Sequence, residues 1–208
     1  MKQRLATALL ATTLLAASAA NLAAQTTSQT QPRPNLLPTR DVAVTFQLQG
    51  SDKIQGDINA SWLSSQRLLR VDNASAPGWV LVEERTRRAS MVMPQGLVMR
   101  LPDSPEVAML MQNPESQGRI TRQGRRTIAG QGCTDWRLDR NDGKSGVACL
   151  TADGVLLRLQ QTGRREILEA TRVAYGPQDP ARFRLPAGAP QITLPEGLRG
   201  LRLPGMGG

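Results

Sequence analysis

The chain has 208 residues, which is enough for one domain of ordinary size with a single hydrophobic core. It carries 26 Lys and Arg residues against 17 Asp and Glu residues, a formal net charge of +9, and it contains no histidine. The lack of histidine excludes the commonest general base and the commonest metal ligand. Because only 3% of the residues are aromatic, the stacking surfaces that bind single-stranded nucleic acid are not expected either.

The first 25 residues are predicted to be a secretory signal peptide. Lys2 and Arg4 precede an apolar run, and the small residues at 17–19 suit cleavage by a signal peptidase. A second acceptable site places the mature N-terminus near Gln25 instead of near Ala20. The apolar run is shorter than the roughly 20 residues that span a bilayer. We therefore expect a soluble periplasmic or secreted protein after signal peptide cleavage.

Residues 26–38 are rich in Thr, Gln and Pro without a period, which predicts a flexible linker. After it, Val42, Val44, Phe46 and Leu48 alternate with less apolar residues, a pattern typical of a half-buried strand. Similar runs separated by turn residues predict further strands at 58–62, 66–72, 78–86, 88–93 and 97–101. The domain is therefore predicted to begin near residue 39 and to grow as a meander of strands.

Residues 103–112 are predicted to form a short amphipathic helix that lies against the sheet. Asp103 at the cap, Pro105 in the first turn and Glu106 three residues after the cap make a helix-start pattern. Leu110 follows at helical spacing. Five methionines of this part of the chain either line an adaptable apolar pocket or fill the core: Met91, Met93, Met99, Met109 and Met111.

The only two cysteines, Cys133 and Cys149, lie on either side of a turn-rich run at 139–146. Folding the chain there sets the two sulfurs opposite each other, and an oxidising compartment favours a disulfide. The alternative is a pair of buried free thiols. Asp153 and Gly154 follow as the signal of a tight hairpin. Strands are predicted on both sides of these turns, at 118–123, 126–138 and 165–175.

The end of the chain changes character. Residues 180–183 are predicted to make one turn that places Phe183 in the open edge of the sheet. From residue 190 to residue 208 the sequence has no period, which predicts a mostly disordered tail. The leucines of this tail either bind a partner or a membrane surface, or belong to a segment without a role.

The sequence does not predict an enzyme: it offers no catalytic residue, no metal site and no cofactor site. Glu83 and Glu84 face opposite sides of one strand, and Asp153 occupies a turn for backbone reasons. Paired cysteines leave no thiolate for catalysis or zinc binding. The many arginines are dispersed along predicted strands, which indicates a solvated sheet face, with a site for polyanions as the alternative.

Five stretches carry one further signal: Pro38 to Val42, Leu69 to Asp72, Cys149 to Arg158 (CLTADGVLLR), Glu169-Ala170, and Asp179 to Gly188 (DPARFRLPAG). Together they resemble uncharacterised exported proteins of Gram-negative bacteria, similar in fold to the carriers LolA and LolB and to the sensor domain of RseB. The resemblance covers roughly the predicted domain at 39–189. It implies a mainly β (α+β) fold, in which a strongly curved antiparallel sheet forms an unclosed half-barrel with one to three short helices over its concave face.

The first functional hypothesis is a periplasmic binding protein whose apolar cavity holds an acyl chain or another apolar ligand. Exposed arginines would meet anionic head groups at a membrane surface. The alternative is a protein-interaction or envelope-sensing module, with an envelope protein as its partner and the cavity filled as core. A monomer is expected in both cases. The candidates to line the cavity are Phe46, Trp62, Trp79, Met91, Met93, Leu110 and Trp136.

Overall fold

The computed structural model describes residues 33–51, 55–101 and 118–193 of the chain. Within these ranges the chain forms one sheet of twelve strands in the order β12-β6-β5-β4-β3-β2-β1-β11-β10-β9-β8-β7. All neighbouring strands pair antiparallel except β12, which runs parallel to β6. The strands are β1 (Val42–Gln49), β2 (Ile58–Leu63), β3 (Leu68–Asn73), β4 (Trp79–Glu83), β5 (Arg88–Val92), β6 (Val98–Arg100), β7 (Gly118–Ile128), β8 (Gln131–Arg140), β9 (Ser145–Leu150), β10 (Leu156–Gln161), β11 (Ile167–Tyr175) and β12 (Gln191–Thr193).

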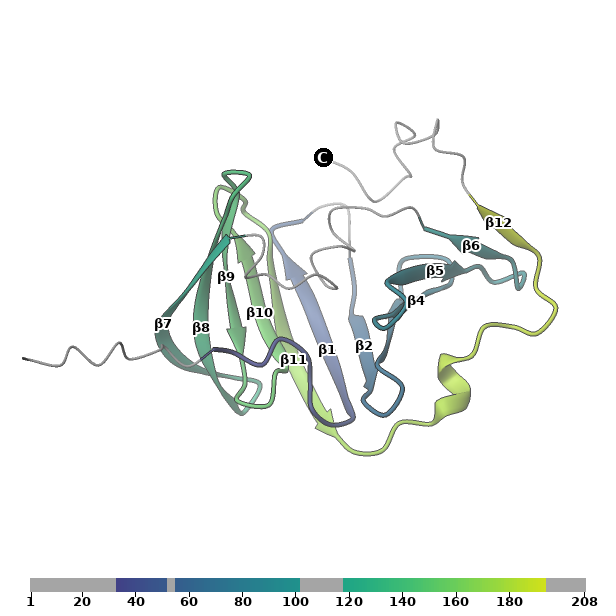
Figure 1. The fold of residues 1–208 in the computed structure, drawn as a ribbon, viewed down its shortest axis with the longest axis horizontal. Helices are drawn as coiled ribbons and strands as arrows, with labels where there is room; N and C mark the ends of the chain where they lie inside the picture. The colour runs from purple at the N-terminus through teal and green to yellow at the C-terminus, as the bar shows by residue number, and fades with distance from the viewer. Residues whose placement is uncertain (1–32, 52–54, 102–117, 194–208) are drawn as a thin grey trace, which may run out of the picture. The chain divides into compact units, whose positions relative to one another are not determined.

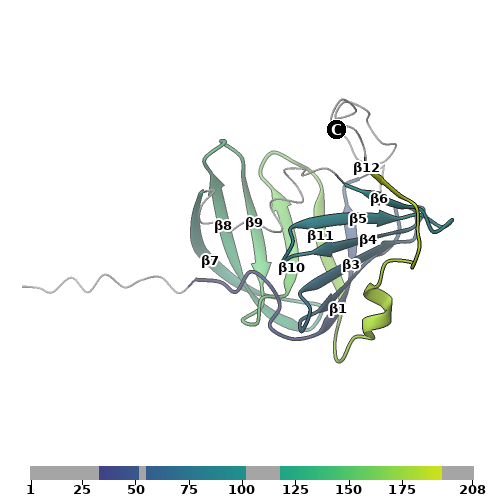
Figure 2. The ribbon, with the colours of Figure 1, turned by 45° about the vertical axis from the view of Figure 1, so that its right-hand side comes forward.

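The sheet is open, since β12 and β7 stand at the two ends of the strand order and do not pair with each other. Strands β7 to β11 lie side by side with β1 (Figure 1), and Figure 2 shows β3, β4 and β5 running across the direction of β8, β9 and β10. The predicted unclosed, strongly curved antiparallel sheet is therefore confirmed. The only helix within the described ranges is the 3-10 helix η2 (Pro180–Phe183). The helix predicted at 103–112 and the signal peptide predicted at 1–25 lie outside them.

Alternation along the strands gives the sheet one apolar face. Val42, Val44 and Phe46 of β1 are buried, and Trp62 and Ile58 of β2 lie directly opposite Val42 and Phe46. Side chains that lie opposite each other on neighbouring strands point to the same side of a sheet. We call this side the core face, and the candidate site lies on it.

The C-terminal segment covers the other face of β2, β3 and β4. Phe183 of η2 is 2% exposed and packs against Leu63 and Leu81, whose side chains point away from the core face. The predicted turn is therefore present, but the position predicted for Phe183 is wrong. Helix η2 contacts β3, which lies in the interior of the sheet and not at an edge.

Strand β12 also departs from the prediction. The sequence predicts a disordered tail from residue 190, whereas Gln191 pairs with Val98 and the next two residues continue the pairing along β6. Three residues without a turn signal or a period carry too little information to predict a strand. The rest of the predicted tail, from residue 194 onwards, lies outside the described residues.

The strand predicted at 126–138 is interrupted by a turn. Strand β7 ends at Ile128, and β8 begins at Gln131 directly opposite it. Between them Ala129 and Gly130 both have positive φ, 49° and 74°. Two such residues make the type I′ turn whose twist matches that of the flanking strands. Because alanine seldom adopts positive φ, Ala-Gly is a much weaker hairpin signal than Asn-Gly or Asp-Gly.

The predicted disulfide is confirmed. Cys133 of β8 and Cys149 of β9 are bonded, with their Cα atoms 5.5 Å apart. The turn before β9 closes where the Arg140 amide donates to the Lys144 carbonyl oxygen at 2.8 Å. Both cysteines are buried in the main core cluster, together with Leu157 of β10. The disulfide therefore joins neighbouring strands in the half of the sheet that ends at β7.

Candidate binding cavity

The core face holds an apolar cavity with a volume of about 240 Å³. Strands β1 to β4, β10 and β11 contribute to its wall, and so does a segment that precedes β1. Among the described residues of the wall, Glu84 is the only charged one. The described residues of the wall are Leu36, Leu37, Pro38, Val42, Val44, Phe46, Ile58, Ala60, Trp62, Leu69, Val71, Val82, Glu84, Gly154, Val155, Leu156 and Leu168.

Strand register explains why these side chains meet. Trp62 lies opposite Val42 on one side and opposite Leu69 on the other, and Leu69 in turn lies opposite Val82. Ala60 stands between larger side chains in the next row of the face, where its methyl group fills less space than they do. A small residue among large ones leaves room that an added apolar group can fill.

Residues 35–40, which we call the strap, precede β1, and residues 36–38 of the strap line the cavity. The Trp62 indole Nε1 donates to the Pro38 carbonyl oxygen at 2.8 Å, and the Thr39 amide donates to the Asp153 carbonyl oxygen at 3.0 Å. Gly154 has φ +89°, and a Cβ atom there would lie 2.2 Å from the Leu37 carbonyl oxygen. Only glycine therefore lets the strap approach the β9–β10 turn this closely.

The Asp153 side chain fixes the strap to the sheet. Its carboxylate accepts hydrogen bonds from Thr151 Oγ1 at 2.6 Å, Arg40 Nε at 2.8 Å and the Tyr175 hydroxyl at 3.2 Å. The Arg40 guanidinium also lies 3.7 Å from the centre of the Tyr175 ring. Partial burial raises the pKa of Asp153, but the hydrogen bonds from Thr151 and Arg40 outweigh it and hold the pKa below its ordinary value. The carboxylate is thus charged at neutral pH.

The charge of Glu84 in the cavity wall is neutralised by a neighbouring side chain. Arg67 Nε donates to Glu84 Oε2, and the Glu84 amide donates to the Arg67 carbonyl oxygen at 3.1 Å. The hydrogen bond from Arg67 is the main cause that lowers the pKa of Glu84. Arg67 also lines an adjoining hollow of about 470 Å³, which shares Trp62 and residues 36–38 with the cavity. A polar group at the end of an apolar ligand would therefore meet a paired carboxylate and a guanidinium.

Of the six predicted cavity residues that the structure describes, it places two in the wall, Phe46 and Trp62. Trp79 points to the opposite face, where it packs near Phe183 and its ring lies 4.1 Å from the Arg70 guanidinium carbon. Trp136 lines a separate hollow of about 540 Å³ beside β7.

The predicted methionines that the structure describes, Met91, Met93 and Met99, do not belong to the wall of the cavity. Met91 of β5 lies opposite Val80 of β4, whereas the wall residue of β4 is Val82. Met93 follows the end of β5. Leu110 lies outside the described residues.

Sequence reasoning missed the strap, Glu84 as a wall residue and the side-chain role of Asp153. A signal for the strap was present, because Leu36 and Leu37 are the only large apolar residues in a polar, proline-containing stretch. The role of Asp153 depends on Arg40 and Tyr175, which are far from it in the chain and meet it only in the fold.

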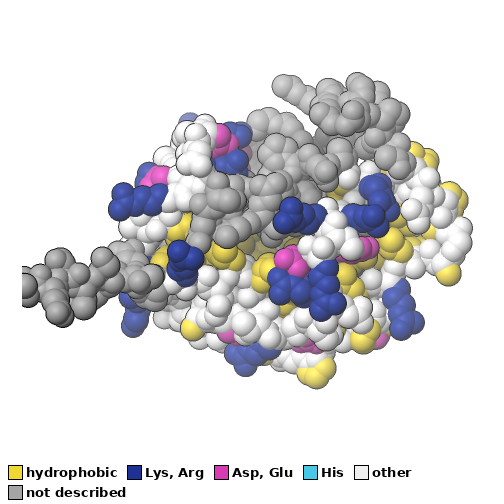
Figure 3. All heavy atoms as spheres, viewed as in Figure 1, with side chains coloured by type: hydrophobic (Ala, Val, Ile, Leu, Met, Phe, Trp, Pro, Cys, Tyr) yellow, Lys and Arg dark blue, Asp and Glu magenta, His cyan; other side chains and the backbone are white. Residues whose placement is uncertain are grey.

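Basic side chains are scattered over the side of the molecule shown in Figure 3, with apolar atoms visible between them. Within residues 33–51, 55–101 and 118–193, no group of three Cys, Asp or Glu side chains could hold a metal ion. Among the same residues, no helix is both long and apolar enough to cross a membrane.

Comparison with known proteins gives a likeness in fold alone. No family model matches the chain, and no curated protein does. An uncharacterised conserved protein from Thermus thermophilus is similar with a TM-score of 0.52 and 14% identity, over 75% of this chain and 91% of that one. MucB is another similar structure, with a TM-score of 0.49 and 11% identity. MucB in the Pseudomonas aeruginosa MucA/MucB complex has a TM-score of 0.46 and 13% identity. The match covers 74% of this chain with either MucB structure, and 60% and 58% of the respective MucB chains.

Proposed function

We propose that the chain is an exported, non-enzymatic binding module whose cavity takes an apolar group, such as an acyl chain, from a larger ligand. The observation that carries the proposal is the composition of the wall, whose described residues are apolar except for one carboxylate that already has a partner. Transfer of an alkyl chain from water into such a wall is favourable by roughly 0.8 kcal/mol per buried methylene group.

The volume decides how much of a ligand enters. Sites for whole small molecules usually measure about 300–1,000 Å³, so a cavity of about 240 Å³ takes one part of a lipid rather than all of it. The polar end would remain outside, near Arg67 and the adjoining hollow. Exposed arginines elsewhere on the surface would favour anionic head groups over neutral ones.

A periplasmic or secreted location is part of the proposal. The buried disulfide supports it, because disulfides persist in oxidising compartments. The pattern of the first 25 residues supports it independently.

The same volume that limits the ligand also favours a second candidate function, a protein-interaction module in which the cavity is residual space in the core.

Bromine quenching of tryptophan fluorescence separates the two functions. Only Trp62 of the three tryptophans lines the cavity, so brominated dodecanoate should quench Trp62 at short range. We expect saturable quenching in the wild type and in Trp79→Phe, and loss of the saturable part in Trp62→Phe. Equal saturable quenching in Trp62→Phe, or none in the wild type, would contradict the proposed site.

A cavity-filling variant that keeps all tryptophans completes the test. Ala60→Leu places a larger side chain in the wall, whereas Ala174→Leu adds the same atoms at an exposed position of β11. We expect Ala60→Leu to weaken the binding of brominated dodecanoate by about tenfold or more, since it occupies part of the volume. Ala174→Leu should bind as the wild type does.

A further inference from the structure

Strand β7 forms one end of the described sheet and pairs only with β8 (Figure 1). It is the longest of the described strands, with 11 residues, whereas β12 at the other end has three. About half of the peptide groups of such an edge strand point outwards, without a partner in the ladder. An edge of this length is a template on which another extended chain can add as a strand.

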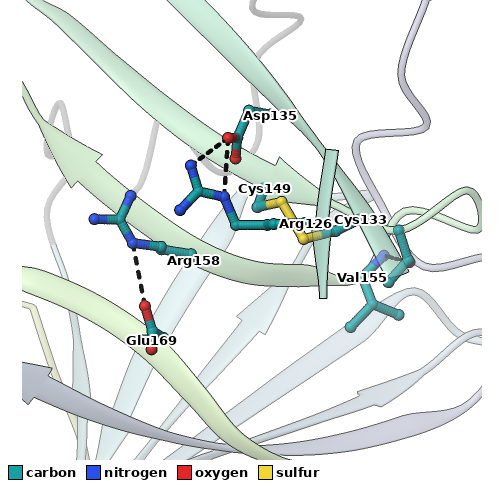
Figure 4. Close-up of a disulfide and its surroundings, with 8 residues drawn as sticks. Arg126, Cys133, Asp135, Cys149, Val155, Arg158 and Glu169 are labelled. Atoms are coloured by element: carbon teal, nitrogen blue, oxygen red, sulfur yellow. Dashed lines mark hydrogen bonds and ion pairs between the residues drawn. A yellow bond between two sulfur atoms is a disulfide. The ribbon is translucent and has the colours of Figure 1, made fainter. Parts of the chain in front are cut away.

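The charge of this edge is strongly one-sided. Strand β7 carries Arg119, Arg122, Arg125 and Arg126, all exposed, and no carboxylate. Arg126 forms an ion pair with Asp135 of the neighbouring strand β8, close to the disulfide (Figure 4). The other three arginines have no ion pair or side-chain hydrogen bond within the described part of the chain. Three guanidinium groups along one edge strand would attract an acidic segment.

The same arginines argue against a second copy of this chain as the occupant. Two β7 strands paired with each other would bring arginines against arginines, and like charges on facing strands are destabilising. A β-bulge between Arg122 and Arg125 bends the strand and interrupts its regular edge, which makes the pairing of two β7 strands less favourable. A lipid surface offers negative charge but cannot supply the directed donors and acceptors that outward peptide groups require.

We propose that the outer edge of β7 docks an extended acidic segment of a partner protein, which adds to the sheet as a further strand. Alternate side chains of that segment would lie on the side of the sheet to which Arg125 and Trp136 point. The hollow of about 540 Å³ there is lined by these two residues and by Thr134, Thr127 and Leu150 among others. Main-chain pairing would supply affinity, and this hollow would select one side chain of the partner.

The test uses the purified full chain and a labelled ten-residue peptide that alternates Glu with Val and Thr. Fluorescence anisotropy should give saturable binding, and binding should weaken by about tenfold in the triple variant Arg119→Gln, Arg122→Gln, Arg125→Gln, because three exposed ion pairs are lost. The control variant Arg88→Gln, Arg172→Gln, Arg184→Gln removes the same charge from exposed positions off β7. We expect the control to bind as the wild type does.

Hydrogen exchange tests the strand pairing itself. The peptide should slow amide exchange in β7 and leave β12 unchanged, since only β7 would gain ladder hydrogen bonds. Equal loss of binding in the two triple variants would overturn the proposal, as would binding without any protection in β7. A concentration-dependent dimer of the wild type that protects β7 would also overturn it, because a second copy would then be the occupant.

Discussion

At the scale of single residues, Asp153 joins three parts of the fold. Its carboxylate binds the strap through Arg40, its own turn through Thr151, and β11 through Tyr175. The sequence predicts the turn, because Asp-Gly before an apolar run favours a tight hairpin. It cannot predict the two distant partners, since these depend on which strands become neighbours.

The depressed pKa of Asp153 gives the first prediction. A carboxyl group whose pKa is lower in the folded state than in the unfolded state stabilises the fold above the unfolded value and loses that contribution as pH falls. With an unfolded pKa of about 3.9, this contribution should disappear as the pH falls below about 4. We expect Asp153→Asn to lower the free energy of unfolding at pH 7 by about 1–2 kcal/mol and to reduce its loss between pH 6 and pH 3. Urea unfolding across this range measures both, and an unchanged pH dependence would contradict the role of Asp153.

Gly154 supports a second prediction, with Gly163 as its control. Both glycines have positive φ, but a Cβ atom at Gly154 would collide with the Leu37 carbonyl oxygen, whereas nothing lies within 4 Å of one at Gly163. Gly163→Ala should lower the free energy of unfolding by about 1 kcal/mol, because it adds only backbone strain. Gly154→Ala should cost about 2–3 kcal/mol because the strap must also move. Equal losses in denaturant unfolding would mean that the strap does not depend on this contact.

At the scale of elements, the disulfide holds the hairpin of β8 and β9. The two cysteines enclose a sequence separation of 16 residues, for which the chain-entropy model gives about 3 kcal/mol of stabilisation. In the double variant Cys133→Ser, Cys149→Ser, the free energy of unfolding measured with denaturant should be lower by about 3 kcal/mol. Amide exchange should accelerate first in β8 and β9. If it accelerated equally in β3 and β4, the hairpin would not be the element that the disulfide stabilises.

Sequence patterns predict the strands and turns better than they predict the side of the sheet to which a side chain points. Alternation in β1, the Asp-Gly hairpin and the cysteine spacing each depend on neighbours in the chain, and all three are present in the structure. The face that a tryptophan occupies depends on strand register over the whole sheet. For this reason Trp62 lines the cavity, while Trp79 points away from it and Trp136 borders another hollow.

At the scale of the whole molecule, the described sheet offers two separate surfaces. The cavity lies between β4 and β10 on the core face, and β7 stands at the end of the strand order. Of these, the sequence predicted an apolar cavity through a resemblance to exported carriers, and the wall includes two of the six predicted residues that the structure describes. Only residues 35–38 of the strap fall within the predicted linker, because residues 26–38 show no period.

Native mass spectrometry measures directly whether the cavity takes an apolar group. The chain would be exported in a Gram-negative host, purified without detergent and weighed before and after denaturation. We expect extra native mass that disappears on denaturation and extracts as a lipid, and a smaller amount of it in Ala60→Leu than in Ala174→Leu. A native mass equal to that of the chain alone, unchanged after incubation with dodecanoate and with extracted envelope lipids, would contradict the claim.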